Sequence, residues 1–303
     1  MNMAQEHICV CICTHKRIGF LKRLLTELAV QETGGLFSYS VVVADNDRER
    51  SAAPVVDEFV AAGSGLRVDY CVQPQQNIAL TRNTAVEHAH GDFIAFIDDD
   101  EWPTRRWLLT LFRACRDSEA DGVLGPVKPH FDEPPPRWVV SGRFYDRPTY
   151  PTGFVIDWKK GRTGNVLLKR RIFDAERQPF RPEFLTGEDQ DFFRRMIDKG
   201  FRFVWCNEAL AYETVPPIRW NRAFMLKRAL LRGAASLAHP TSAVRAAIAK
   251  SVIAAPVYTA ALPFAFAMGQ GRFMTCLVKL CDHVGRLLAV VGVRPVRQPY
   301  VTD

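Results

Sequence analysis

The feature that most constrains the fold is an apolar segment that ends abruptly in four acidic residues. The segment 93–97 is apolar throughout, and Asp98, Asp99, Asp100 and Glu101 follow it directly. A short apolar run of this kind is typical of a strand buried on both faces of a parallel sheet. Because open α/β sheets bind ligands at the carboxyl ends of their strands, we expect these carboxylates at a binding edge. An acidic surface turn is the alternative, and we rank it second.

The rest of the chain supports an α/β fold with a doubly wound, mostly parallel sheet flanked by helices. Strand patterns precede the acidic segment at 7–14, 39–44 and 66–72, and helical patterns lie between them at 18–30, 53–62 and 78–90. Further helices are predicted at 102–114, 192–199 and 219–237, and short strands at 164–168, 201–205 and 209–213. The stretch 125–151 is predicted to be irregular, because it is rich in Pro, Gly and aromatic residues.

Four adjacent carboxylates repel one another unless a cation is present. A hard divalent ion with oxygen ligands, Mg²⁺ or Mn²⁺, suits such a cluster and would also bridge the phosphates of a nucleotide. The sequence contains neither Gly-x-Gly-x-x-Gly nor a P-loop. Any bound phosphates would therefore be held by a metal and by side chains.

The composition and charge of the chain limit the kinds of binding partner that we expect. The 303 residues carry a net charge of +7, with basic clusters at 159–162, 169–171, 194–195 and 219–232. Such clusters suit nucleic acid, anionic lipid or a phosphorylated substrate, but no nucleic-acid-binding motif is present, so we expect no nucleic acid partner. Cys9, Cys11 and Cys13 alternate along one strand, which is poor geometry for a disulfide, and we expect reduced cysteines. Residues 1–7 show no signal-peptide pattern.

Four motifs occur in a fixed order. They are Cys13-Thr14-His15-Lys16-Arg17; Val43-Ala44-Asp45-Asn46-Asp47; Asn77 to Asn83 leading to Phe96 to Asp100; and Gly187-Glu188-Asp189-x-Asp191-Phe192. Together they resemble the inverting nucleotide-sugar glycosyltransferases of family 2, which have the GT-A fold. The variant here is similar to bacterial exopolysaccharide enzymes of the succinoglycan glucosyltransferase kind. The resemblance implies an enzyme with a nucleotide-sugar donor, favoured to be a UDP-hexose.

The resemblance also implies which residues bind the donor. Thr14, Arg17, Asp45 and Asp47 match the positions that hold the base and ribose, since a carboxylate can accept from uracil N–H or a ribose hydroxyl. An Asx-type turn is the alternative for the 45–47 segment. Arg82 matches a residue beside the diphosphate, and the alternative is a solvated helix charge.

The acidic motif and its partners would hold the metal. Asp98 and Asp100 match the metal motif, with Asp100 touching the ion most directly and Asp98 also reaching the ribose. Asp99 is counted among the donor-binding residues, although it could point back into the fold. Members of this fold often supply a His after the last core strand, whereas this chain has Glu213 there. Glu213 remains a candidate ligand because it too offers oxygen.

Catalysis is expected at the fourth motif. Asp189 matches the base that takes the proton of the attacking acceptor hydroxyl, and Glu188 would orient it or contact the acceptor. Neighbouring carboxylates raise one another's pKa, which suits a base. These acids also fit the start of a helix, and a capping role explains Asp191 better. Arg219-Trp220 keeps part of the Gln-x-x-Arg-Trp motif of processive members without its Gln, so we expect single transfers, with Arg219 gripping the diphosphate.

The domain prediction places a GT-A domain at 1–225, with a nucleotide-sugar half at 7–100 and an acceptor half at 101–225. A helical, amphipathic tail follows at 226–303. Residues 251–270 carry no formal charge and include Pro256 and Pro263, so they could span a bilayer, lie on it or pack in a core. The tail and its basic residues favour the cytoplasmic face of the inner membrane, beside a growing glycan on a polyprenyl diphosphate. The alternatives are a sugar nucleotidyltransferase and a non-catalytic nucleotide- or glycan-binding module.

Overall fold

The computed structural model describes residues 5–174, 176–184, 187–237 and 244–293. The chain forms two compact units, the first from 1–128 and 147–213 and the second from 129–146 and 214–303. The second unit therefore combines the segment 129–146 with the chain from residue 214 onward, whereas the sequence prediction placed a single boundary at residue 225.

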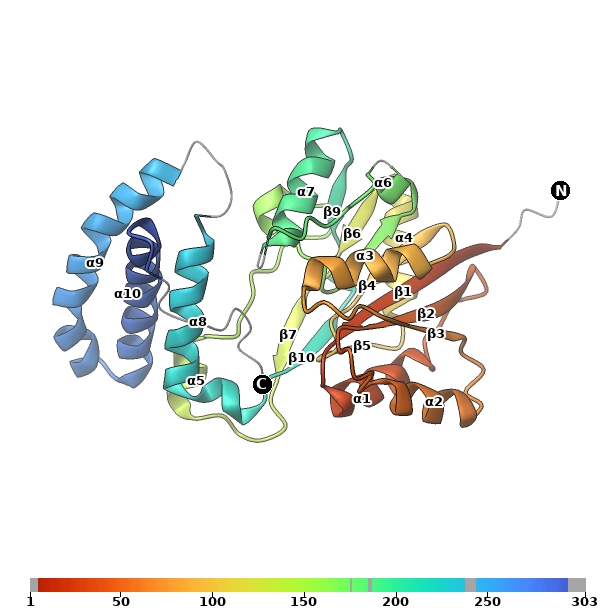
Figure 1. The fold of residues 1–303 in the computed structure, drawn as a ribbon, viewed down its shortest axis with the longest axis horizontal. Helices are drawn as coiled ribbons and strands as arrows, with labels where there is room; N and C mark the ends of the chain where they lie inside the picture. Colours follow the sequence, from red (N-terminus) through yellow and green to blue (C-terminus); the bar gives the residue numbers. More distant parts are fainter. Residues whose placement is uncertain (1–4, 175, 185–186, 238–243, 294–303) are drawn as a thin grey trace. The chain divides into compact units, whose positions relative to one another are not determined.

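A seven-stranded sheet organises the first unit (Figure 1). Its order is β3-β2-β1-β4-β8-β6-β9, formed by β1 (Glu6–Thr14), β2 (Phe37–Asp45), β3 (Val68–Val72), β4 (Phe93–Phe96), β6 (Gly122–Leu124), β8 (Val166–Lys169) and β9 (Phe203–Trp205). Only β8 runs antiparallel to its neighbours β4 and β6, while the other pairings are parallel. The predicted α/β class with a mostly parallel sheet is confirmed.

Helices cover both faces of this sheet. The side chains of β1 alternate between the two faces and are buried on both. Ile8, Val10 and Ile12 enter one core, and Cys9 and Cys11 enter the other. The first core is completed by α1 (Ile18–Leu28), α2 (Ala53–Ala61) and α4 (Trp107–Asp117), and the second by α3 (Ile78–His88), α6 (Arg171–Asp174) and α7 (Glu188–Asp198). Figure 1 shows α3 and α1 on opposite sides of β1. All eight cysteines are free thiols, as predicted.

The predicted helix at 102–114 is wrong at its start. Trp102 and Pro103 belong to β5 (Glu101–Pro103), which pairs antiparallel with β10 (Ala211–Thr214), and α4 begins at Trp107. The Trp102 ring stacks on Tyr212 with the ring centres 4.5 Å apart. This contact joins residues far apart in sequence, so local patterns could not predict it. The stretch predicted to be irregular contains β7 (Val127–His130) and α5 (Arg137–Ser141), and β7 completes a small sheet of order β5-β10-β7.

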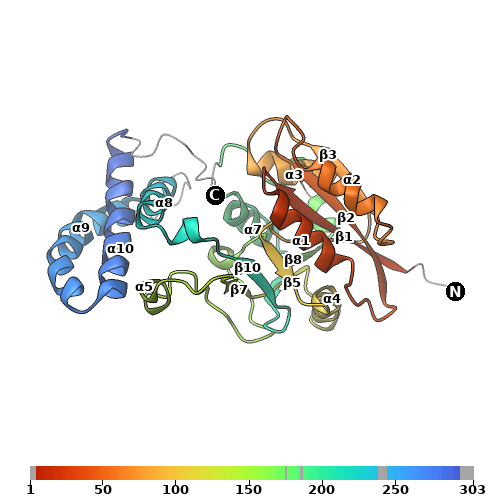
Figure 2. The same cartoon turned by 90° about the horizontal axis from the view of Figure 1, so that it is seen from below.

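The second unit is helical. The predicted helix 219–237 is split into a 3₁₀ turn η2 (Pro217–Trp220) and α8 (Arg222–Ala235), and the tail forms α9 (Val244–Ala267) and α10 (Gln270–Val290). Figures 1 and 2 both show α10 between α8 and α9. Glycines permit the close α8–α10 approach, since a Cβ on Gly285 would lie 2.2 Å from the Leu230 carbonyl oxygen. In the described part of the chain, α9 alone is long and apolar enough to cross a membrane, and little of it is buried.

Candidate functional site

The candidate site begins where β1, β2 and β4 end at the same edge of the sheet. Thr14 pairs in register with Asp45, and Cys11 pairs with Phe96, so the segments that follow β1 and β4 leave the sheet side by side. The acidic segment 98–101 turns sharply here, with the Glu101 amide donating to the Asp98 carbonyl. The predicted convergence of polar residues at one edge is therefore present.

Asp99 points back into the fold. Its carboxylate accepts a 2.8 Å hydrogen bond from the Thr14 hydroxyl and a 3.0 Å contact from Arg17, whose guanidinium also lies 3.3 Å from Asp100. Burial raises the pKa of Asp99 to about 7, against the lowering effect of Arg17. Thr14, Arg17, Asp99 and Asp100 thus form one linked cluster, in which Arg17 bridges the two acids.

Asp45 supports the loop that follows β2. It is fully buried; one oxygen accepts from the Asp47 amide, and the other accepts from the Ala52 amide and the Tyr70 hydroxyl. This is the Asx-type turn that the sequence offered as the alternative. Asp47 accepts from the Glu49 amide and lies 3.9 Å from the Lys16 ammonium. The neighbouring Asn46 ties this loop to the start of α3, because its oxygen accepts from the Asn77 amide.

Arg82 joins the acidic strand end to the fourth motif. It lies on α3, is buried, and forms an ion pair with the buried Glu188 at the start of α7. Its guanidinium also lies 3.8 Å from Asp98, whose side chain is 44% exposed. The solvated helix charge considered for Arg82 is therefore excluded. Arg82 thus contacts one residue from each of two predicted groups, Asp98 of the acidic segment and Glu188 of the fourth motif.

Asp189 has the electrostatic environment of a base. It lies in the first turn of α7 and accepts from the Gln190 amide at 2.7 Å. Burial and then the charge of Glu188 raise its pKa to about 6, although Arg82 opposes them. A carboxylate with this pKa is largely ionised near neutral pH and takes up a proton more readily than an ordinary Asp.

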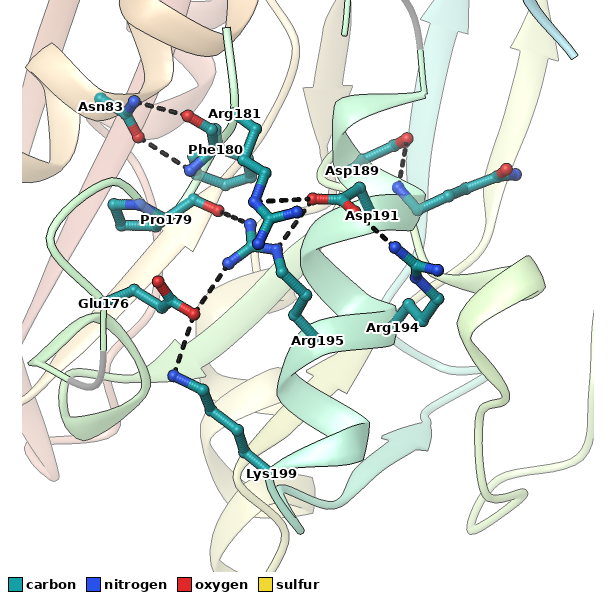
Figure 3. Close-up of polar contacts among 11 residues, drawn as sticks. Asn83, Glu176, Pro179, Phe180, Arg181, Asp189, Asp191, Arg194, Arg195 and Lys199 are labelled. Carbon is teal, nitrogen blue, oxygen red and sulfur yellow. Dashed lines mark hydrogen bonds and ion pairs between the residues drawn. The ribbon is translucent and has the colours of Figure 1, made fainter. Parts of the chain in front are cut away.

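Asp191 anchors α7 through arginines rather than by capping it (Figure 3). The helix N-cap is Gly187, at φ +83°, and no side chain caps it. Asp191 is fully buried and binds Arg195 at 2.8 Å and Arg194 at 3.0 Å. Its place in the first turn still suits the helix dipole. The capping role predicted for Asp191 is replaced by an ion-pair anchor that fixes the direction of α7.

A second acidic group lies beside the strand end. Glu101 on β5 is paired in register with Glu213 on β10, and Arg147 bridges the two carboxylates. Gly164 packs against this group, since a Cβ there would lie 2.9 Å from both Asp98 Oδ2 and Glu101 Oε1. One buried oxygen of Glu101 has no hydrogen-bond partner. Arg147 thus pairs with Glu213, for which the sequence predicted a role as a metal ligand.

The fit of a divalent ion rests on Asp98 and Asp100. Within the described residues no three His, Cys, Asp or Glu side chains gather as a metal site, so Asp98, Asp100 and Glu213 do not form a closed ligand set. Mg²⁺ and Mn²⁺ in nucleotide sites commonly use one or two carboxylates, with phosphate and water oxygens completing the shell. The partly exposed Asp98 carboxylate and the excess of acids around it fit that arrangement.

Arg219 belongs to the second unit. It is buried in η2, and its carbonyl accepts from the Tyr145 hydroxyl at 2.6 Å. Trp220 packs against Phe131, with ring centres 5.9 Å apart. The packing role considered for Trp220 is therefore present, and a diphosphate contact by Arg219 stays a prediction.

Sequence reasoning missed two residues of this region. Arg147 lies in the stretch 125–151, where no periodic pattern singles it out. Asn165 holds the loop beside Gly164, because its amide donates to the Pro126 and Ala209 carbonyls and its oxygen accepts from Trp107. The Gly-Asn pair was a signal for Asn165, since Asn tolerates the positive φ of 55° found there.

Comparisons with known proteins find matches at the level of family and fold. The family model described as glycosyl transferase family 2 matches residues 9–176. The succinoglycan biosynthesis protein ExoM of Rhizobium meliloti is 32% identical over 96% of this chain and 95% of its own. A mannosyltransferase of Pyrobaculum calidifontis, solved with GDP-Man and Mn²⁺, is similar in fold, with a TM-score of 0.61, 16% identity, and coverage of 94% and 88%. Residues 1–349 of S. aureus TarS with UDP-GlcNAc give a TM-score of 0.53 at 14% identity, covering 95% and 93%.

Proposed function

Because this chain belongs to glycosyl transferase family 2, and is thus a glycosyltransferase, we propose that it transfers a hexose from a nucleotide diphosphate sugar to a glycan hydroxyl with inversion. The observation that carries the proposal is the position of Arg82. One buried guanidinium contacts both Asp98, at the donor edge, and Glu188, beside Asp189. A donor bound at Asp98 and an acceptor bound beside Asp189 would therefore lie near the same guanidinium.

Asp189 is the base of the proposed reaction. The acceptor hydroxyl attacks the anomeric carbon as Asp189 takes its proton. The bond from the anomeric carbon to the diphosphate oxygen breaks on the opposite face, and the nucleoside diphosphate leaves with that electron pair. Glu188 stays paired with Arg82, which keeps the first turn of α7 in position. Burial and then the charge of Glu188 raise the pKa of Asp189, while Arg82 opposes them.

Asp98 and Asp100 are the residues that would hold Mn²⁺ or Mg²⁺. When bound, the ion supplies Lewis-acid neutralisation of the departing diphosphate. Arg17 positions Asp100, and Thr14 and Arg17 hold Asp99 away from the ligand. Asp47 and Asp98 are assigned to the base and ribose, whereas the oxygens of Asp45 are used by the loop itself.

Relatives guide the choice of donor and acceptor. The similar structures were solved with UDP-GlcNAc or GDP-Man, and ExoM is named for succinoglycan biosynthesis. We assign a UDP-hexose donor and a growing exopolysaccharide on a polyprenyl diphosphate, with one sugar added per encounter because the Gln of the processive motif is absent. No nucleic acid partner is proposed.

The second unit is assigned to the cytoplasmic surface of the inner membrane. Helix α9 exposes several large apolar side chains, among them Ile253, Phe264 and Phe266. A soluble helix this apolar would normally be buried. We expect the protein to sediment with anionic vesicles and Phe264→Glu to reduce this binding. Equal recovery of both proteins in the supernatant would refute the membrane assignment.

The transfer is tested by nucleotide release. The full chain is incubated with a panel of UDP-sugars and GDP-Man, with Mn²⁺ or Mg²⁺ and a crude bacterial lipid extract as acceptor. We expect one donor to release its nucleoside diphosphate, and chelation or Asp100→Asn to abolish the release. Silence across the panel, together with no nucleotide binding, would contradict the proposed function.

A further inference from the structure

A cavity of about 130 Å³ lies in the first unit, on the side of β6 and β9. Its wall is formed by the ends of these strands, by the segment 147–150 and by the segment 159–164. A single water occupies about 30 Å³ of liquid, so the cavity has room for a small polyatomic group. None of the residues that line it is among those assigned to the donor, the metal or the base.

The charge of this cavity is one-sided. Arg147, Lys159, Lys160 and Arg162 line it, and no acidic residue does so in the part of the chain that the structure describes. Arg147 is neutralised by Glu101 and Glu213, and Lys160 is paired with Asp157. Lys159 and Arg162 have no ion-pair partner among the described residues.

Like charges facing one cavity are unfavourable unless an anion is bound there. Arg147 and Arg162 both line the cavity. Burial and then the charge of Arg147 lower the pKa of Arg162, while Asp189 and Glu213 oppose them. An oxyanion placed between Arg147 and Arg162 would remove this repulsion and accept from the planar forks of both arginines. A phosphate or a carboxylate has the geometry for such a contact.

The cavity also neighbours the proposed base. Arg162 lowers the pKa of Asp189 through its charge, so the two side chains lie within electrostatic range. The segment around it packs on α7, because Gly161 abuts the Phe193 ring and the Gln190 side chain donates to the Lys159 carbonyl at 3.4 Å. The wall of the cavity therefore contacts α7 at Gln190, the residue that follows Asp189.

Aromatic rings complete the wall. Tyr150 and Trp205 line the cavity, with ring centres 5.2 Å apart in an edge-to-face contact. Aromatic rings beside cations give a bound group both an apolar surface and a charged contact. This combination differs from the donor edge, where the charged groups are mainly carboxylates.

We propose that this cavity is an acceptor subsite that binds an oxyanion, a phosphate or a carboxylate carried by the acceptor glycan, through Arg162, Lys159 and Arg147. The inference rests on the proposed function, since it treats Asp189 as the base. It makes the acceptor an anionic molecule and assigns its recognition to residues separate from the donor site. The phosphate source would be the lipid carrier, and the carboxylate source an acidic sugar.

Calorimetric binding to the full chain tests the subsite without any turnover. Saturating UDP and Mg²⁺ are present throughout, so that the donor edge is filled. The probes are glucose, glucuronate and glucose 1-phosphate, which share one ring and differ in charge. We expect an anionic probe to bind about tenfold more tightly than glucose, as one charge-assisted hydrogen bond implies. The stronger of the two anions identifies the source.

Variants assign the binding to the cavity. Arg162→Ala should weaken the anionic probe about tenfold while Arg162→Lys recovers part of the affinity, because the charge is the main determinant. Arg113→Ala is the matched control, since Arg113 is an exposed arginine of the same unit on α4, and it should leave binding unchanged.

Two results would overturn the subsite. One is equal affinity of the wild-type protein for glucose and both anions, including no measurable binding of any of them. The other is an equal effect of Arg162→Ala and Arg113→Ala. Failure of UDP itself to bind would instead contradict the proposed function, and the probes would then be measured without UDP.

Discussion

The loops after β2 and β4 look alike in sequence and differ in structure. Each loop follows a buried strand, carries several acidic residues and lies at the same edge of the sheet. In the first loop, both oxygens of Asp45 are used by two backbone amides and by Tyr70. In the second loop, the side chain of Asp98 is 44% exposed. The position of an acid indicates where a ligand could bind, but only its hydrogen bonds show whether it is available.

The same contrast recurs within the first turn of α7. Asp191 is held by Arg194 and Arg195, and its side chain is fully buried. Asp189, two residues earlier, accepts one local amide and has a pKa of about 6. One acid is therefore structural and the other is suited to proton transfer. Substitutions at the two positions should therefore separate effects on stability from effects on activity.

The largest effect is expected from Asp189→Asn. The amide keeps the shape of the carboxylate and cannot take the proton of the acceptor hydroxyl. General-base catalysis contributes about 10²- to 10⁴-fold, so we expect kcat to fall within that range while the donor KM changes little. Initial rates of nucleoside diphosphate release with acceptor present measure this. Undiminished turnover would remove Asp189 from the mechanism.

Asp191→Asn should act in the opposite way. Removing one charge of a buried ion pair typically costs 3–5 kcal/mol, and we expect about 3 kcal/mol because Glu176 still partners Arg195. Denaturant unfolding of the first unit gives the value. The control is Lys22→Ala, which breaks an exposed pair with Glu58 and should change stability by less than about 1 kcal/mol. Similar stabilities for the two variants would mean that Asp191 is no anchor.

These contrasts also explain how much the sequence could predict. The strands and helices of 7–97 follow from local periodicity, and their prediction needed no tertiary information. The strand at Trp102 could not be predicted this way, because its partner Tyr212 is distant in sequence. In the same way, Asp45 is hydrogen-bonded by Tyr70 and Glu213 is ion-paired with Arg147. Local sequence patterns could predict neither partner. Motifs identified the candidate acids, whereas their partners required the fold.

A paired comparison of Asp45→Asn with Asp98→Asn tests the two loops directly. In Asp45→Asn, the amide nitrogen replaces an acceptor and leaves a buried donor unpaired, which costs about 1–3 kcal/mol. Asp98→Asn removes a charge from a partly exposed side chain and should change stability far less while weakening Mn²⁺-dependent turnover. Thermal unfolding and metal titrations of activity separate the two. If Asp98→Asn were the less stable variant, the contrast between the loops would fail.

The smallest effect concerns pH. The pKa of Asp189 is raised to about 6 by burial and by Glu188, so its basic form is lost as the pH falls through that value. We expect kcat/KM to be level above about pH 7 and to fall about tenfold for each pH unit below 6. Glu188→Gln removes the neighbouring negative charge and should move the midpoint to lower pH, because that charge raises the pKa of Asp189. An unshifted midpoint in Glu188→Gln would show that another group controls the profile.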